Sequence, residues 1–127
     1  CPGLVGQIEQ GAARSPETKK ILENALEPML DAGVDEIVLG CTHYPFVLPI
    51  IREIVGDNVQ VIDPAPAVAR QVGRLLQEYQ LENNRNEPGK TRYITSGNPS
   101  KFKEMLGDLL GIDSLVEGVS WTADRLV

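Results

Sequence analysis

The sequence alternates between amphipathic helical stretches and short apolar runs, and this alternation limits the fold more than any other feature. From Ser15 to about Leu30, apolar side chains recur at helical spacing, and Gly33 ends the stretch. Ser15 is a good N-cap and Pro16 suits the first helical position. Residues 36–40 (EIVLG) then form a short apolar run, which is typical of a parallel strand buried on both faces.

The same alternation continues along the chain. Further helices are expected at about residues 46–55, 66–79 and 98–110, and further strands at 59–62, 91–95 and 114–121. Strand–helix alternation predicts an α/β fold with a mainly parallel sheet flanked by helices. Because ligands bind beyond the carboxyl ends of parallel strands, loops 41–45, 63–65 and 96–98 are the candidate site regions.

Composition divides the chain and excludes some functions. Residues 82–90 (ENNRNEPGK) hold almost no apolar side chain and predict a linker or exposed loop between an α/β portion, residues 1–81, and a strand–helix–strand segment, residues 91–127. The net charge is −6 and the basic residues are scattered, so no nucleic-acid partner is expected. No apolar run approaches the roughly 20 residues that cross a bilayer, so no membrane partner is expected either. With only two cysteines, reduced thiols in a cytoplasmic protein are expected.

Cys41 and His43 carry the chemistry of the segment Gly40–Pro45 (GCTHYP). On its own, a Cys-x-His pair is a weak signal, because most free cysteines are small buried hydrophobes. Three features favour a site: Gly40 permits a sharp turn at a strand end, His43 can exchange a proton with the thiol, and the Thr42 and His43 amides suit a carboxylate. Cys1 is expected to be structural, and Asp63 is expected to cap a helix or accept a hydrogen bond.

Four segments, in this order, resemble the glutamate racemases of the aspartate/glutamate racemase superfamily. GCTHYP is similar to the segment around that family's second catalytic cysteine. Residues 1–11 (CPGLVGQIEQG) resemble its C-P-x-F-V…V-E-x-G, residues 61–65 (VIDPA) its D-P/S-A, and residues 93–98 (YITSGN) its Y-x-T-S-G-D/N. The chain departs at Leu4, where the family has Phe, and at Gly6, where it has Pro; both look like tolerable packing changes.

The resemblance implies the C-terminal half of a two-domain, pseudo-symmetric racemase fold. Family members are longer and begin with D-S-G, P-Y-G and C-N-T segments, none of which occurs in this sequence. We therefore expect a fragment that is inactive without a missing N-terminal half. Residues 91–127 are expected to return to that missing domain.

The implied activity is the cofactor-independent interconversion of L- and D-glutamate, which supplies D-glutamate for peptidoglycan. By the resemblance, Cys41 is the base for L-glutamate and the proton donor when D-glutamate reacts. His43 assists it, Thr42 helps hold the substrate, and Glu9 belongs to the proton network; without the resemblance, Glu9 would be a solvated surface acid. The expected partners are a small-molecule substrate, the missing half and further copies in a homo-oligomer, with no cofactor or metal.

Two other functions stay open. One is a single-cysteine enzyme resembling arylmalonate decarboxylases, in which one thiol only delivers a proton; the Cys41-x-His43 pair argues against it. The other is a non-catalytic interaction or regulatory module, which would need no unusually reactive thiol.

Overall fold

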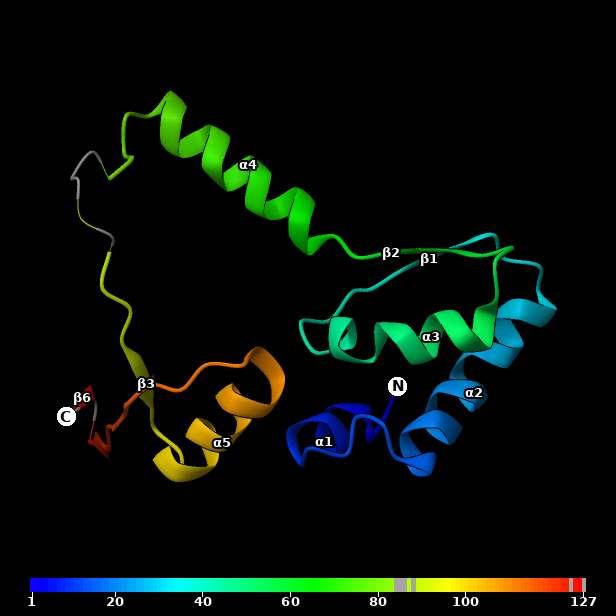
Figure 1. Ribbon diagram of the computed structural model, residues 1–127, viewed down its shortest axis with the longest axis horizontal. Helices are drawn as coiled ribbons and strands as arrows, with labels where there is room; N and C mark the ends of the chain where they lie inside the picture. The colour runs from blue at the N-terminus through cyan, green and yellow to red at the C-terminus, as the bar shows by residue number, and fades with distance from the viewer. Residues whose placement is uncertain (84–86, 88, 124, 127) are drawn as a thin grey trace. The chain divides into compact units, whose positions relative to one another are not determined.

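The computed structural model describes residues 1–83, 87, 89–123 and 125–126 (Figure 1). The chain divides into two compact units, Cys1–Glu82 and Asn83–Val127. The linker predicted over residues 82–90 falls in part on 84–86 and 88, which lie outside the described residues. The first unit contains α1 (Leu4–Glu9), α2 (Pro16–Asp31), β1 (Glu36–Val38), the 3-10 helix η1 (Tyr44–Val47), α3 (Leu48–Val55), β2 (Gln60–Ile62) and α4 (Ala65–Glu78).

The long helix α2 begins at the predicted cap. The Ser15 hydroxyl oxygen accepts a hydrogen bond from the Thr18 amide at 3.1 Å, and Pro16 occupies the first turn. Thr18 is fully buried, and its hydroxyl donates to the Ala12 carbonyl at 2.7 Å. Its buried polar group is therefore satisfied, and the start of α2 is fixed to the loop that follows α1.

Strands β1 and β2 pair in parallel, with Ile37 opposite Val61. They are joined through η1 and α3, which makes a β–α–β unit, and α3 also packs on α2. The core of this unit gathers apolar side chains from α1, α2, β1 and its end, η1 and α3: Leu4, Ile8, Leu22, Leu26, Ile37, Leu39, Val47, Ile51 and Val55.

The expectation that residues 36–40 are buried on both faces is wrong for this chain. Ile37 is 6% exposed, but its neighbour Val38 is 61% exposed. Because successive strand side chains point to opposite faces, the face that carries Val38 lacks the cover given to the face that carries Ile37. Helix α4, which follows β2, buries none of its own residues.

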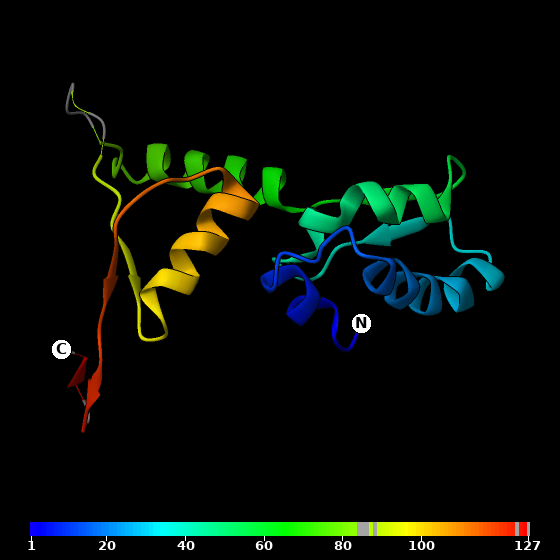
Figure 2. The same ribbon diagram turned by 60° about the horizontal axis from the view of Figure 1, so that its bottom comes forward.

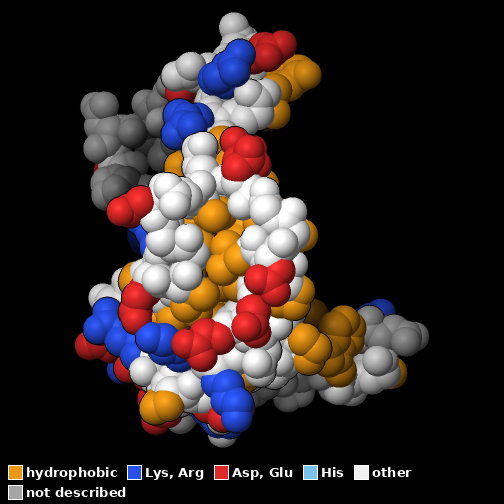
Figure 3. All heavy atoms as spheres, turned by 90° about the vertical axis from the view of Figure 1, so that its right-hand side faces the viewer, with side chains coloured by type: hydrophobic (Ala, Val, Ile, Leu, Met, Phe, Trp, Pro, Cys, Tyr) orange, Lys and Arg blue, Asp and Glu red, His pale blue; other side chains and the backbone are white. Residues whose placement is uncertain are grey.

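Helix α4 continues from β2 beyond the strand pair, as both ribbon views show (Figures 1 and 2). Its exposed apolar side chains recur at helical spacing: Val68, Val72, Leu75, Leu76 and Tyr79 just past its end. Apolar side chains also reach the surface between charged ones on the face drawn in Figure 3. An amphipathic helix of this kind carries an apolar stripe that could pack against another element.

The second unit repeats the β–α–β pattern. Strands β3 (Tyr93–Thr95) and β4 (Val116–Gly118) pair in parallel around α5 (Pro99–Leu110), whose N-cap Asn98 accepts a hydrogen bond from the Lys101 amide at 3.1 Å. Strands β5 (Trp121–Thr122) and β6 (Arg125–Leu126) form a short antiparallel pair that the sequence pattern did not predict. The predicted α/β class is confirmed. Instead of one sheet, however, the described strands form three separate pairs.

Candidate active site

The candidate site forms where the chain leaves β1. The Leu39 amide donates to the Ile62 carbonyl at 3.0 Å, which extends the pairing just past the strand. The chain then turns at Gly40, and the Tyr44 amide donates to the Cys41 carbonyl at 3.2 Å. Cys41 therefore lies in a turn held between the strand pair and η1.

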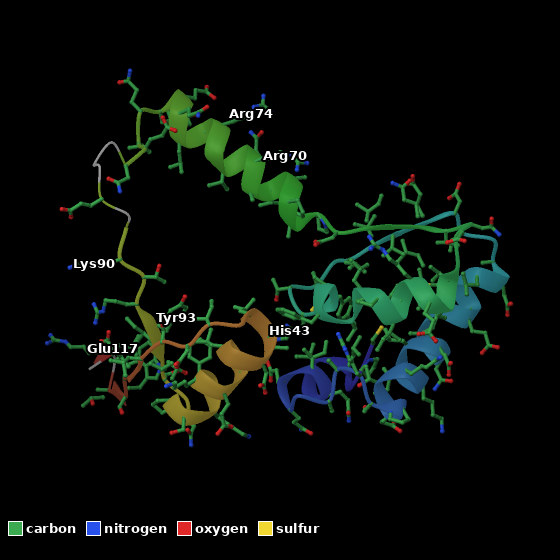
Figure 4. All side chains as sticks on the ribbon, in the orientation of Figure 1. His43, Arg70, Arg74, Lys90, Tyr93 and Glu117 are labelled. Atoms are coloured by element: carbon green, nitrogen blue, oxygen red, sulfur yellow. The ribbon has the colours of Figure 1, made fainter. Side chains whose placement is uncertain are left out.

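This turn and the end of α1 bring the four predicted site residues together. Cys41 Sγ lies 4.0 Å from His43 Nδ1, and His43 Nε2 lies 3.0 Å from Glu9 Oε1. Glu9 is the last residue of α1, far from His43 in sequence, and Figure 4 shows His43 beside α1. Thr42 Oγ1 also lies 3.4 Å from His43 Nδ1. The fold thus aligns a thiol, an imidazole and a carboxylate.

The contacts of His43 define what its ring can do. An ionised carboxylate can only accept hydrogen bonds, so the nitrogen facing Glu9 is the one that carries the proton in a neutral ring. Nδ1 is then the unprotonated nitrogen, and it faces both the Cys41 thiol and the Thr42 hydroxyl. In this tautomer, assigned from the hydrogen-bond partners, His43 can take the thiol proton while Glu9 stabilises the resulting imidazolium.

A pocket of about 610 Å³ opens beside Cys41. Its size is within the usual range for small-molecule sites. It lies at the carboxyl ends of β1 and β2, where a parallel sheet is expected to bind ligands, and the first turn of α4 completes it. The lining residues are Leu39, Gly40, Cys41, Thr42, Pro45, Asp63, Pro64, Ala65, Val68 and Ala69. His43 and Glu9 are not among them, whereas Cys41 and Thr42 both line the pocket and lie near His43 Nδ1.

Of the two roles predicted for Asp63, the hydrogen-bond acceptor is confirmed, because its Oδ1 accepts a hydrogen bond from the Ala65 amide at 3.0 Å. The N-cap of α4 is Pro64, and this helix has no side-chain cap hydrogen bond. Cys1 is exposed and does not line the pocket. Loop 96–98 belongs to the second unit.

The sequence reasoning missed the apolar wall that Val68 and Ala69 of α4 contribute. The signal that could have predicted this wall is that the amphipathic stretch begins soon after the end of β2.

Among the described residues, no group of three or more His, Cys, Asp or Glu side chains is placed to hold a metal ion. No helix formed by those residues is both long and apolar enough to cross a membrane.

Comparison with known proteins identifies relatives along most of the chain. The sequence model of the Asp/Glu/hydantoin racemase family matches residues 1–72. The chain is 49% identical over 107 residues to a glutamate racemase of Roseiflexus sp., covering 84% of this chain and 39% of that protein. It is 45% identical over 112 residues to one of Ectopseudomonas mendocina, covering 87% and 42%. The chain thus spans about two fifths of the length of these curated relatives.

Solved structures of glutamate racemases are also similar to this chain. A glutamate racemase isoform of Bacillus anthracis superimposes with a TM-score of 0.84 at 28% identity, covering 94% of this chain and 45% of that one. A Francisella tularensis glutamate racemase solved in complex with D-glutamate gives 0.80 at 27% identity, covering 92% and 44%. The family match includes Glu9, Cys41, Thr42 and His43. From this match over more than half of its residues, and from these relatives, the chain belongs to the Asp/Glu/hydantoin racemase family.

Proposed function

We propose that this chain is the C-terminal, thiol-bearing part of a cofactor-independent glutamate racemase. The observation that carries the proposal is the alignment of Cys41, His43 and Glu9 beside a pocket: Sγ lies 4.0 Å from Nδ1, and Nε2 lies 3.0 Å from the Glu9 carboxylate. The names of the relatives supply the substrate, since they are called glutamate racemases.

In the proposed reaction, His43 first accepts the Cys41 proton and leaves a thiolate facing the pocket. The thiolate removes the α-proton of L-glutamate, and the electron pair of the broken C–H bond passes to the α-carbon. A second thiol on the opposite face delivers its proton to that carbon, which gives D-glutamate. In the reverse direction, Cys41 is the proton donor.

One thiol is not enough for this reaction. A single base returns the proton to the face that it left, so inversion needs an acid on the other face. We place the opposing cysteine in an N-terminal half. The greater length of the relatives, of which this chain spans about two fifths, leaves room for such a half. Thr42, on the pocket wall beside Cys41, is proposed to hold the substrate.

We propose that the same N-terminal half packs against the apolar stripe of α4. Residues 91–127 are also proposed to pack on that half. Val72 is 50% exposed and Leu76 is 39% exposed, so α4 offers apolar surface to a partner. The assembled protein is proposed to act in the cytoplasm as a homo-oligomer that supplies D-glutamate for peptidoglycan.

The test joins this chain to the portion of the Roseiflexus relative that it does not span, and follows racemisation from each enantiomer by circular dichroism. The fused protein is expected to racemise glutamate. Cys41→Ser should lower the rate by at least about 10²–10⁴-fold, the usual contribution of an acid–base group.

Cys1→Ser is the matched control, because Cys1 is exposed and outside the pocket; its rate should stay near that of the parent protein. A fused, folded protein without glutamate racemisation, or one in which Cys41→Ser is as active as Cys1→Ser, would contradict the proposal.

A further inference from the structure

Helix α1 carries Glu9, and this helix is too short to hold that residue in place on its own. It has six residues, and isolated helices shorter than about 12–15 residues are marginal in water. Glu9 is its last residue, so fraying of the final turn would move the carboxylate away from His43 Nε2, which lies 3.0 Å from it. The contact between Glu9 and His43 therefore depends on what holds this end of α1.

A Schellman motif closes the end of α1: the residues just after the helix donate to carbonyls of its last turn. The Gly11 amide donates to the Ile8 carbonyl at 3.0 Å, and the Ala12 amide donates to the Gln7 carbonyl at 2.9 Å. Gly11 has a φ of 73°, the left-handed conformation that this motif requires and that glycine adopts at little cost. Ala12 thus makes the outermost hydrogen bond of the α1 cap.

The side chain of Thr18, at the start of α2, holds the same Ala12. Its hydroxyl donates to the Ala12 carbonyl at 2.7 Å. Among the residues that the structure describes, Thr18 is the one polar residue classed as buried, and a buried hydroxyl is costly unless it is hydrogen-bonded. The N-cap hydrogen bond of α2 uses Ser15 Oγ and the Thr18 amide, so the Thr18 hydroxyl is left to join α2 to the end of α1.

We propose that Thr18 is a positioning residue for Glu9 in its contact with His43; this assignment rests on the proposed function. The Thr18 hydroxyl holds Ala12, Ala12 closes the cap of α1, and Glu9 ends that helix. The Glu9 carboxylate then stays at His43 Nε2, where it stabilises the imidazolium that forms when Nδ1 takes the Cys41 proton. A catalytic group misplaced by about 1 Å can cost about 10²-fold in rate.

Thr18→Val removes the hydroxyl and keeps the shape of the side chain. The Ala12 carbonyl retains the hydrogen bond from the Ser15 amide at 2.9 Å, so no buried polar group loses its last partner and the variant should fold. In the fused protein, Thr18→Val should lower kcat by roughly 10–100-fold. KM should change little, because neither Thr18 nor Glu9 lines the pocket. Thr18→Ser, which keeps the hydroxyl, should restore kcat.

A double-mutant cycle with Glu9→Ala separates positioning from stability. An effect that acts through Glu9 cannot be lost twice, so Thr18→Val should lower kcat by less than about twofold further in the Glu9→Ala background. Ile51→Val, at a buried residue of α3, is the stability control: it lowers Tm and should leave kcat unchanged in both backgrounds. Equal losses from Thr18→Val in both backgrounds, or a Thr18→Ser variant as slow as Thr18→Val, would limit Thr18 to stabilising the fold and overturn the inference.

Alkylation of Cys41 by iodoacetamide in the same proteins gives a readout that needs no turnover. Thr18→Val should slow it, Thr18→Ser should not, and Glu9→Ala should abolish the difference. If this pattern appears in a parent protein that does not racemise glutamate, the proposed function fails and the positioning role stands. If racemisation is normal and Thr18→Val changes neither rate, the inference alone fails.

Should Thr18→Val not fold, Ser15→Ala takes its place in the cycle, because Ser15 Oγ makes the other side-chain contact between the two helix ends, 3.3 Å from Gln7 Oε1. The same coupled loss of kcat is then expected. A loss of equal size with Glu9 and with Glu9→Ala would overturn the inference.

Discussion

The two thiols of this chain differ in what surrounds them. Cys41 is half-buried, 4.0 Å from an imidazole nitrogen, whereas Cys1 is exposed at the N-terminal end of the first unit. A base within reach can take the proton of a thiol as the thiol reacts. We expect iodoacetamide to alkylate Cys41 faster than Cys1 near pH 7, as read by mass spectrometry of each peptide.

His43→Asn should remove this preference, because it deletes the proton acceptor and leaves the thiol in place. Alkylation of Cys41 only after denaturation would show that the thiol does not face the pocket.

The sequence predicted only some of the contacts that form the candidate site. Cys41 and His43 are two residues apart after a predicted strand, so their meeting followed from local spacing. Glu9 is 34 residues from His43, and no periodicity predicts that contact. Only the family resemblance pointed to Glu9. The position of Asp63 in the pocket wall was missed, because a helix cap or a hydrogen-bond acceptor already explained an aspartate there.

At the scale of single elements, the start of α2 depends on Ser15. Its side chain satisfies the Thr18 amide, one of the first-turn donors that have no partner within the helix. Ser15→Ala should lower the free energy of unfolding by about 0.5–2 kcal/mol, the usual cost of a lost N-cap. Urea denaturation measures this. Ser120→Ala, at an exposed position outside any described helix, should change it little; equal effects would show that Ser15 does not act as a cap.

A pH-dependent ion pair joins Arg92, just before β3, to Glu117 in β4. Arg92 donates to Glu117 through Nε at 2.8 Å and through Nη2 at 2.5 Å, and this pairing lowers the pKa of Glu117 below its ordinary value of 4.5. A carboxylate whose pKa is lower in the folded state stabilises the fold above its unfolded pKa. That contribution is lost as the pH falls through the lowered folded pKa.

Glu117→Gln should therefore reduce the acid sensitivity of the second unit below about pH 4.5. Thermal melts at several pH values measure the change. The effect should shrink in high salt, because both side chains are exposed. Parallel curves for Glu117→Gln and the parent would contradict the assignment.

The elements themselves were predictable where signals were strong. α2 combined an N-cap, a first-turn proline and a regular apolar stripe, and it formed at the predicted place. The six-residue α1 was not predicted, because it is too short for periodicity to show. The burial of β1 was overestimated, because an apolar run reports what a strand can bury and not what covers it.

For the whole molecule, the apolar stripe of α4 predicts self-association of the chain alone. An exposed stripe of this kind gains stability when a second surface excludes water from it. Sedimentation velocity should show concentration-dependent association of residues 1–127, and Leu76→Glu should reduce it. Gln77→Glu adds the same charge beside the stripe and serves as control. A monomer at all concentrations would contradict this expectation.

In the proposed reaction, Cys41 exchanges protons with one face of the α-carbon of glutamate. The most direct test uses the fused protein and a glutamate analogue with a leaving group on the β-carbon, because loss of that group follows a single proton abstraction. With Cys41→Ser, elimination from the L-enantiomer should fall by at least about 10²-fold, while elimination from the D-enantiomer, started by the opposing thiol, should largely persist. Equal impairment of both enantiomers, or of neither, would contradict the assignment of Cys41 to one face.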